Sequence, residues 1–169
     1  PRQFREPNIQ RVIESALDSA GLAPEWLEVE ITEGTAMENV ARSTEVLSEI
    51  ADIGVRISID DFGTGYSSLA YLKAFALHCL KIDQSFVRTT TRGTRPVILR
   101  SIIALAHDLG MEVVAEGAES DSDAVELYQL GCEYAQGFAF GEPMTAEAAH
   151  DLLVEKPART RAQKAIASE

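Results

Sequence analysis

Acidic side chains recur in this sequence at the ends of short apolar runs. Glu30 ends one such run, and the adjacent pair Asp60 and Asp61 ends the next. Glu116 ends a later run. Carboxylates that crowd together repel one another, and burying them without partners is unfavourable. Divalent cations relieve that repulsion, and oxygen ligands favour Mg²⁺ or Mn²⁺ over zinc. Two such ions can hold the attacking and leaving oxygens of a phosphoryl displacement, so these residues suggest metal-assisted cleavage of a phosphate ester.

A lysine and two further polar side chains accompany these acids. Lys81 and Asp83 end a third apolar run, and Gln136 lies within the last one. The simpler interpretation is that each acid caps the helix that follows it, because acids suit helix N-termini. That interpretation is favoured for any single acid, but it explains poorly why acids end several strands together with Lys81.

Apolar periodicity places these residues in an alternating series of strands and helices. Strands are predicted at 26–31, 55–60, 77–83, 112–117 and 134–140, and helices at 9–20, 37–53, 98–109 and 124–130, with a short helix near Tyr66, a last helix after Thr145 and Asp121 as an N-cap. Such alternation indicates a parallel sheet with right-handed crossovers, either an open doubly wound sheet or part of a β/α barrel. In both, ligands bind at the edge formed by the carboxyl ends of the strands.

Composition excludes several classes of protein. Hydrophobic content of 46% and charged content of 25% are ordinary for a globular domain. The sequence has no apolar run of about 18 residues and no signal peptide. The net charge of −12 disfavours a nucleic acid polymer as partner, and it would repel a phosphate ester unless cations concentrate positive charge at one point. Cys79 and Cys132 are too few for a disulfide framework, so we expect a cytoplasmic setting, which leaves open membrane attachment of a parent protein.

Two glycines follow the adjacent acidic pair, in the segment DFGTGYSSL. Gly63 and Gly65 permit backbone conformations closed to other residues and a close approach to a ligand. With Asp83 ending the next strand, the pattern imitates a dinucleotide-binding fingerprint. Ser68 stands where that fingerprint has its third glycine, and the acidic pair would repel a pyrophosphate. A nicotinamide cofactor site is therefore disfavoured.

The segment IDDFGTGYSSL, with EITE before it and LKID-SFV after it, resembles the EAL-type phosphodiesterases that hydrolyse cyclic di-GMP. VVAEG-E and QGF-F then follow in the order of the family. The resemblance covers residues 1–153, and residues 154–169 are predicted to form a disordered basic tail. It implies a TIM-type β/α barrel, incomplete here, with five βα units.

The resemblance also implies a role for each site residue. The domain of such enzymes holds two Mg²⁺ or Mn²⁺ ions and opens one phosphodiester of cyclic di-GMP to give linear pGpG. The implied metal ligands are Glu30, Asp60, Asp61 and Glu116, with Lys81, Glu116 and Gln136 acting on the water that attacks or on waters at the metals. Asp83 would lie near the nucleotide. Glu33 and Glu119 would be supporting residues, the latter in Ala118-Glu119-Ser120, where the family usually has Val-Glu-Thr.

The same resemblance gives Glu33 the task of anchoring a loop that links the metal site to a dimer interface. That loop comprises Phe62, Gly63, Thr64, Gly65, Tyr66, Ser67 and Ser68. Outside this scheme, His78, His107 and His150 are predicted to be structural or surface residues. Trp26, Phe138 and Phe140 are predicted to be core or lining residues and not platforms on which a nucleotide stacks.

The family's Glu-Ala-Leu and Asn-x-Ser strand ends, which supply two further metal ligands, do not occur in this sequence. We therefore expect this chain alone to bind metal poorly and to show little turnover. Three explanations stay open: a fragment of an enzyme, a shortened protein that acts as a non-catalytic cyclic di-GMP receptor or regulatory and dimerisation module, or a site completed by a second copy. Open barrel edges predict a homo-oligomer, formed there or through the loop after Asp61. GGDEF-type or sensory domains in a parent protein are further expected partners.

Overall fold

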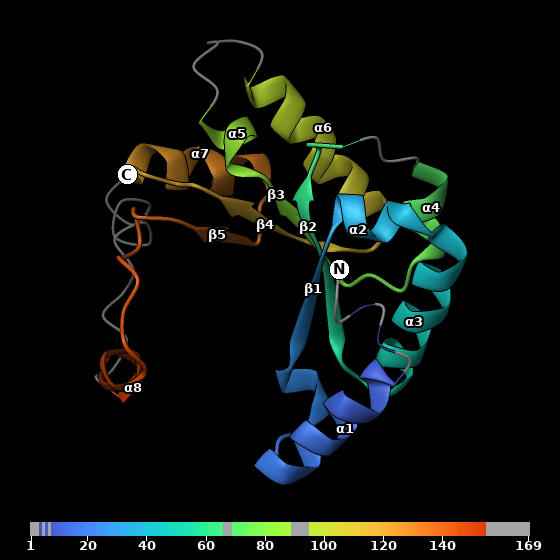
Figure 1. Ribbon diagram of the computed structural model, residues 1–169. Helices are drawn as coiled ribbons and strands as arrows, with labels where there is room; N and C mark the ends of the chain where they lie inside the picture. The colour runs from blue at the N-terminus through green and yellow to red at the C-terminus, as the bar shows by residue number, and fades with distance from the viewer. Residues whose placement is uncertain (1–3, 5, 7, 66–68, 89–94, 155–169) are drawn as a thin grey trace.

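The computed structural model describes residues 4, 6, 8–65, 69–88 and 95–154, and its centre is a parallel sheet (Figure 1). The strands are β1 (Glu28–Thr32), β2 (Arg56–Phe62), β3 (Cys79–Ile82), β4 (Glu112–Glu116) and β5 (Tyr134–Gln136). They pair in the order β1-β2-β3-β4-β5, so each strand lies beside its neighbours in the sequence. This confirms the predicted α/β class with five βα units.

Most of the helices that pack on this sheet lie on one side of it. The helices are α1 (Ile9–Ala20), the 3₁₀ turn η2 (Pro24–Trp26), α2 (Glu33–Glu38), α3 (Val40–Asp52), α4 (Leu69–Ala74), α5 (Gln84–Val87), α6 (Arg95–Asp108), α7 (Asp121–Leu130) and α8 (Ala146–Val154). Figure 1 shows α3, α4, α6 and α7 on the same side of the curved sheet, with α8 apart from them. A doubly wound sheet reverses its strand order and carries helices on both faces. Sequential order with helices on one face is the arrangement of a β/α barrel, so the structure decides between the two predicted architectures.

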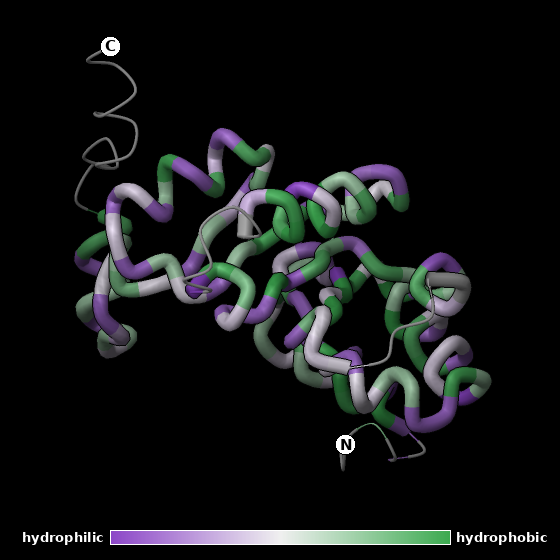
Figure 2. Tube along the Cα trace, turned by 90° about the horizontal axis from the view of Figure 1, so that it is seen from above, coloured by the Kyte–Doolittle hydropathy of each residue, from purple (hydrophilic) through white to green (hydrophobic). Residues whose placement is uncertain are grey.

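The hydrophobic core fills the space between the sheet and these helices. Alternate residues of each strand point to opposite faces, and the residues that face the helices are fully buried, as Ile59, Leu80 and Val113 show. A second cluster packs Ile57 against Val46 and its neighbours on α3. Along the helices, hydrophobic and hydrophilic residues alternate as expected for one packed face (Figure 2). The opposite face of the sheet is thereby left for the polar residues of the strands.

Most predicted elements differ by a few residues at their ends, and two differ in ways that have a clear local cause. The helix predicted at 37–53 is two helices, α2 and α3, separated at Asn39, whose side chain accepts a hydrogen bond from the Arg42 N–H and caps α3. The strand predicted at 134–140 ends at Gln136. The reason lies at Gly137, where an added Cβ would stand 2.1 Å from the carbonyl oxygen of Ala118. This contact turns the chain away from the sheet.

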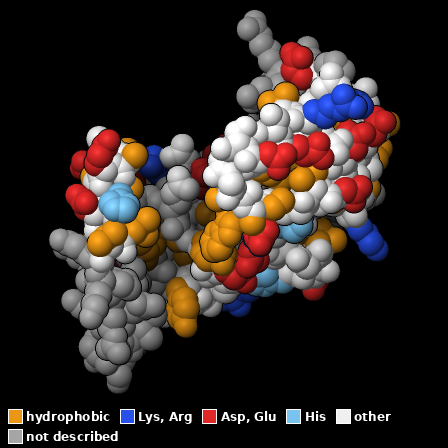
Figure 3. Space-filling model, turned by 90° about the horizontal axis from the view of Figure 1, so that it is seen from below, with side chains coloured by type: hydrophobic (Ala, Val, Ile, Leu, Met, Phe, Trp, Pro, Cys, Tyr) orange, Lys and Arg blue, Asp and Glu red, His pale blue; other side chains and the backbone are white. Residues whose placement is uncertain are grey.

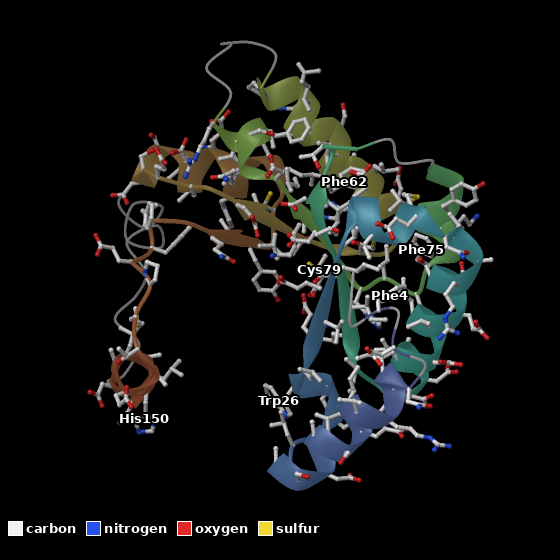
Figure 4. All side chains as sticks on the ribbon, viewed as in Figure 1. Phe4, Trp26, Phe62, Phe75, Cys79 and His150 are labelled. Carbon is white, nitrogen blue, oxygen red and sulfur yellow. The ribbon has the colours of Figure 1, made fainter. Side chains whose placement is uncertain are left out.

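Three single-residue assignments are corrected. The N-cap of α7 is Ser120 and not Asp121, because Ser120 and Asp123 form a reciprocal capping box. Trp26 is neither core nor lining: it belongs to the turn η2 and is 77% exposed (Figure 4). The short helix expected near Tyr66 begins at Leu69, while Tyr66 itself and the basic tail after Val154 lie outside the described residues.

Both cysteines, Cys79 and Cys132, are buried free thiols. Burial raises the pKa of Cys132 to about 12. Within the described ranges, no helix is long and apolar enough to cross a bilayer.

Leu80 and Leu153 provide a matched test of the core. Leu80 is fully buried, whereas Leu153 on α8 is 81% exposed. Leu80→Ala is expected to lower the free energy of unfolding by about 2–5 kcal/mol, because it removes apolar contacts and leaves a cavity. Leu153→Ala, the same chemical change, is expected to alter it by less than about 0.5 kcal/mol. Urea unfolding followed by circular dichroism measures both, and equal losses would contradict this packing.

Candidate active site

Four strand ends meet at one ammonium group. Lys81 Nζ, at the end of β3, lies 2.9 Å from Glu30 Oε1 on β1 and 2.7 Å from Glu116 Oε1 on β4. It also lies 3.1 Å from Asp60 Oδ1 on β2. The Lys81 side chain is 9% exposed, and the three acids are more open to solvent. The structure therefore brings together the acids that the sequence placed at separate strand ends, with the lysine between them.

The acids keep this lysine charged. Burial is the largest single influence and would lower the pKa of Lys81, but the interactions with Glu116, Glu30 and Asp60 outweigh it and raise the pKa above its ordinary value. Asp60 Oδ1 is within ion-pair distance of Lys81, yet it is buried and takes no well-aligned hydrogen bond from any described residue. Asp60 thus retains an acceptor that further positive charge could satisfy.

We call the edge that carries Glu30, Asp60, Lys81 and Glu116 the acidic rim. Asp61 follows Asp60 at an irregularity in β2. The register between β2 and β3 shifts between Ile59 and Phe62, and Asp61 has a left-handed backbone with φ of 55°. Such bulges re-aim side chains near active sites, and Asp tolerates this conformation better than most residues. Burial raises the pKa of Asp61, the charges of Asp60 and Asp83 raise it further, and Lys81 opposes them. Asp61 is therefore close enough to Asp60, Asp83 and Lys81 for their charges to act on it.

Glu33 binds the backbone of the loop that follows Asp61. This side chain is 1% exposed, and its Oε2 accepts a hydrogen bond of 2.8 Å from the Gly63 N–H. A Cβ at Gly65 would stand 2.7 Å from Glu33 Oε1, and a Cβ at Gly63 (φ +97°) would stand 2.5 Å from the Phe86 ring. Two glycines therefore allow the backbone to close over a buried carboxylate. This is the contact expected of an anchoring Glu33, although Tyr66, Ser67 and Ser68 lie outside the described residues.

The remaining predicted residues lie close by, with local contacts of their own. Asp83 caps α5 by accepting a hydrogen bond of 2.9 Å from the Ser85 N–H. Thr64 donates its hydroxyl to the Asp61 carbonyl, 2.9 Å away. Gln136 is paired with Glu116 in the sheet and has an exposed side chain. Their roles in binding or catalysis stay predictions.

The histidines make structural contacts. His78 Nδ1 accepts a hydrogen bond of 3.1 Å from the Ile57 N–H, and His107 Nε2 lies 2.9 Å from Glu133 Oε1. His150 lies on the exposed helix α8, away from the rim (Figure 4). All three positions agree with the structural or surface role predicted for them.

An open cavity of about 780 Å³ adjoins Glu116 and was only partly foreseen. It is lined by Gln84, Arg88, Glu116, Gly117, Ala135, Gln136, Gly137, Phe138, Phe140, Gly141, Glu142, Pro143 and Met144. Phe138 and Phe140 are therefore lining residues, as predicted. Arg88 was not predicted, because it begins the polar segment RTTTRGTR, in which no residue stands out as part of a site. It pairs with Glu119 at 2.8 Å, and no local sequence pattern connects two residues so far apart.

The donor set of the rim suits hard divalent cations. Glu30, Asp60, Asp61 and Glu116 offer only oxygen, the ligand type that Mg²⁺ and Mn²⁺ prefer, and buried Asp60 Oδ1 has acceptor capacity to spare. In the part of the chain that the structure describes, no three His, Cys, Asp or Glu side chains are already grouped around a cation position. Three of these acids instead turn toward Lys81. Cations would therefore compete with Lys81 for their oxygens.

Comparison with known proteins places this rim in a family. The family model of the EAL domain matches residues 1–143. The chain is 42% identical over 142 residues to the cyclic di-GMP phosphodiesterase NbdA of Pseudomonas aeruginosa, an alignment that covers 83% of this chain and 18% of NbdA. The chain thus spans about a fifth of the length of the curated relatives it matches.

Solved structures agree with the fold. The MucR phosphodiesterase of Pseudomonas aeruginosa, in complex with c-di-GMP, superposes with a TM-score of 0.83 at 40% identity, over 87% of this chain and 60% of that one. BlrP1 of Klebsiella pneumoniae, in complex with manganese and cyclic di-GMP, gives a TM-score of 0.76 at 33% identity, over 83% of this chain and 36% of that one.

The central lysine can be tested without any assumption about catalysis. Lys81→Met leaves three acids facing one another, so we expect the free energy of unfolding in EDTA to fall by about 1–3 kcal/mol, less than for a fully buried pair because the acids are partly exposed. Saturating Mn²⁺ should restore part of the loss by binding the folded state. Lys73→Met, at an exposed position on α4, is the control. Urea unfolding measures all three, and a Lys81→Met protein as stable as the control would contradict the role of Lys81.

Proposed function

The chain belongs to the EAL domain family, and from this premise we propose that it is part of a phosphodiesterase that hydrolyses cyclic di-GMP to linear pGpG. The observation that carries the proposal is the convergence of Glu30, Asp60 and Glu116 on Lys81 at the carboxyl ends of four strands. In β/α barrels this is the end at which catalysis takes place. The relative NbdA, named as a cyclic di-GMP phosphodiesterase, supports the same reaction.

Glu30, Asp60, Asp61 and Glu116 are the residues proposed to hold two Mg²⁺ or Mn²⁺ ions. When bound, such ions supply positive charge that polarises the phosphoryl oxygens and lowers the pKa of a coordinated water. The chain has 27 acidic against 15 basic residues, and acidic side chains spread over the face seen in Figure 3. Bound divalent ions would concentrate positive charge at one point of this acidic surface and so attract an anionic dinucleotide.

The chain's own residues orient the reaction. The water oxygen forms a bond to phosphorus, one phosphodiester bond breaks, and the released ribose oxygen takes up a proton. Lys81 is placed to transfer its hydrogen bonds from the acids to the attacking water and to the charge that develops on the phosphoryl group. Gln136 orients water from β5, and Asp83 faces the nucleotide. Glu33 fixes the loop that borders the rim through its bond to Gly63.

The reaction is tested in the full-length protein with cyclic di-GMP and Mn²⁺, with pGpG measured by liquid chromatography. We expect turnover that EDTA abolishes and that Asp60→Asn lowers by at least about 100-fold, since removing one preorganised charge from such a site typically has that effect. Asp52→Asn, at an exposed acid at the end of α3, should leave turnover unchanged. Turnover that survives EDTA, or an Asp60→Asn protein as active as Asp52→Asn, would refute the proposal.

A second candidate is a cyclic di-GMP receptor or regulatory module without turnover. The observation that favours it is the ion pairing of Glu30, Asp60 and Glu116 with Lys81, which leaves the acids satisfied without cations. Equilibrium dialysis separates the two functions. A receptor binds cyclic di-GMP equally with and without Mn²⁺ and releases no pGpG, whereas the enzyme releases pGpG only with Mn²⁺.

We further propose that copies of the chain associate through strand edges or through the loop after Asp61. In the described sheet β1 and β5 each have one strand neighbour, so one edge of each carries unpaired backbone groups, which favour strand addition. Sedimentation velocity of these 169 residues over a range of concentrations is expected to show a dimer or larger species. A single monomeric species at every concentration would contradict this.

A further inference from the structure

A second set of charged side chains lies toward the amino ends of the strands. Arg56 Nε on β2 lies 3.3 Å from Glu28 Oε2 on β1, and Arg56 Nη2 binds Glu112 Oε2 on β4. Tyr134 on β5 directs its hydroxyl at Glu112 Oε1, 3.5 Å away. One guanidinium therefore links β1, β2 and β4 directly, and we call Arg56, Glu28 and Glu112 the guanidinium clamp.

The clamp and the acidic rim use the same three strands. Glu28 precedes Glu30 by two positions on β1. On β2, Arg56 precedes Asp60 by four positions. Glu112 likewise precedes Glu116 by four positions on β4. Because residues an even number of positions apart share one face of a strand, each member of the clamp lies on the same face as one acid of the rim.

Cys79 lies beside the clamp, because it pairs in register with Glu112 on β4. It precedes Lys81 by two positions on β3 and is 2% exposed, in the middle of the sheet (Figure 4). Burial, and then the charges of Glu28 and Glu112, raise its pKa to about 11, while Arg56 and Lys81 act in the opposite direction. The thiol is therefore close enough to the clamp and to Lys81 to be influenced by both.

Geometry explains what the clamp does. Strands β1 and β4 are not neighbours, so their separation depends on three successive strand pairings and on the curvature of the sheet. At the curvature of this sheet, Glu30 and Glu116 both reach Lys81. A guanidinium has a planar fork that can bind two carboxylates at once in a fixed geometry. Arg56 holds Glu28 and Glu112, and it thereby sets the distance between the strands that carry Glu30 and Glu116.

We propose that Arg56 is a positioning residue whose guanidinium, bound to Glu28 and Glu112, holds the sheet at the curvature at which the acids of the rim share one cation position. The cations named here rest on the proposed function, whereas the clamp itself is tested without them. An ordinary surface salt bridge contributes little. The clamp differs because its Arg56–Glu112 ion pair joins β2 and β4, which are not neighbours in the sheet and share no backbone hydrogen bonds.

The first test compares Arg56→Met with Arg42→Met in the full-length protein. Arg42 is the matched control because it also pairs with an acid, Glu45 at 2.7 Å, and is as exposed as Arg56, but it lies on α3 away from the rim. Mn²⁺ binding is measured by electron paramagnetic resonance at a temperature where both variants are folded. Arg56→Met is expected to bind Mn²⁺ about tenfold more weakly, the usual effect of losing support for a metal ligand. Arg42→Met should match the wild type, and Arg56→Lys should fall between because an ammonium lacks the fork.

The second test needs neither metal nor turnover. Cys79 and Cys132 are labelled with N-ethylmaleimide, and the rate at each is followed by mass spectrometry. Arg56 lowers the pKa of Cys79, so removing its charge makes the thiolate scarcer and, without any opening, would slow labelling. Faster labelling of Cys79 in Arg56→Met, with Cys132 unchanged, therefore reports that the strands have separated locally.

The outcomes distinguish the clamp from the proposed function. Weaker Mn²⁺ binding together with faster labelling of Cys79 alone supports the clamp. Unchanged or slower labelling of Cys79, equal acceleration at both cysteines, or Mn²⁺ binding as tight as in Arg42→Met overturns it. A wild-type protein that shows no hydrolysis of cyclic di-GMP refutes the proposed function, and the labelling result still decides the clamp.

Discussion

One lysine side chain balances the charge of the candidate site. Lys81 is the meeting point of acids from three other strands, and its ammonium is what allows those acids to stand so close together on a partly buried rim. The parallel sheet brings the strand ends to one edge. Without Lys81, the acids gathered there would repel one another. The irregularity at Asp61 and the loop over Glu33 both lie next to this cluster of one cation and several anions.

The pairing of Lys81 with the acids is also compatible with a site in which the acids exchange the lysine for divalent cations. A lysine surrounded by acids is a stable resting state, and the same oxygens are the ligands that hard divalent cations prefer. Cation binding therefore does not require new residues to enter the rim. It requires the acids to change partner, while Lys81 becomes available for other oxygen atoms. The fold supplies a rigid frame for that exchange, because the opposite face of every strand is locked into the hydrophobic core.

The sequence predicts most of the fold and the residues of the rim, and the reasons are local. Apolar runs ended by acids mark strands whose ends must share one edge, so Glu30, Asp60 and Glu116 are found without coordinates. What escapes prediction depends on contacts between distant segments. Gly137 ends β5 because its backbone meets Ala118, and Arg56 looks like an ordinary charged residue at a strand start until β1 and β4 bring its partners. Trp26 is predicted to be a core or lining residue, but it lies in the turn η2 and is exposed. Ser120 and Asp121 are both plausible caps, and the choice rests on the reach of the Asp123 side chain.

The sequential strand order has a consequence for how the chain acquires its structure during synthesis. Each strand pairs with the next one along the chain, so every loop closure is short and the chain can add one βα unit at a time. Glu30 and the acids of β2 are then synthesised before Lys81, and Glu116 comes last. A nascent chain that has emerged only as far as β2 carries acids that repel one another and still lacks Lys81, whose ammonium offsets their charge. Addition of the third βα unit, which contains Lys81, is therefore the step that first balances the charge of the acids on β1 and β2.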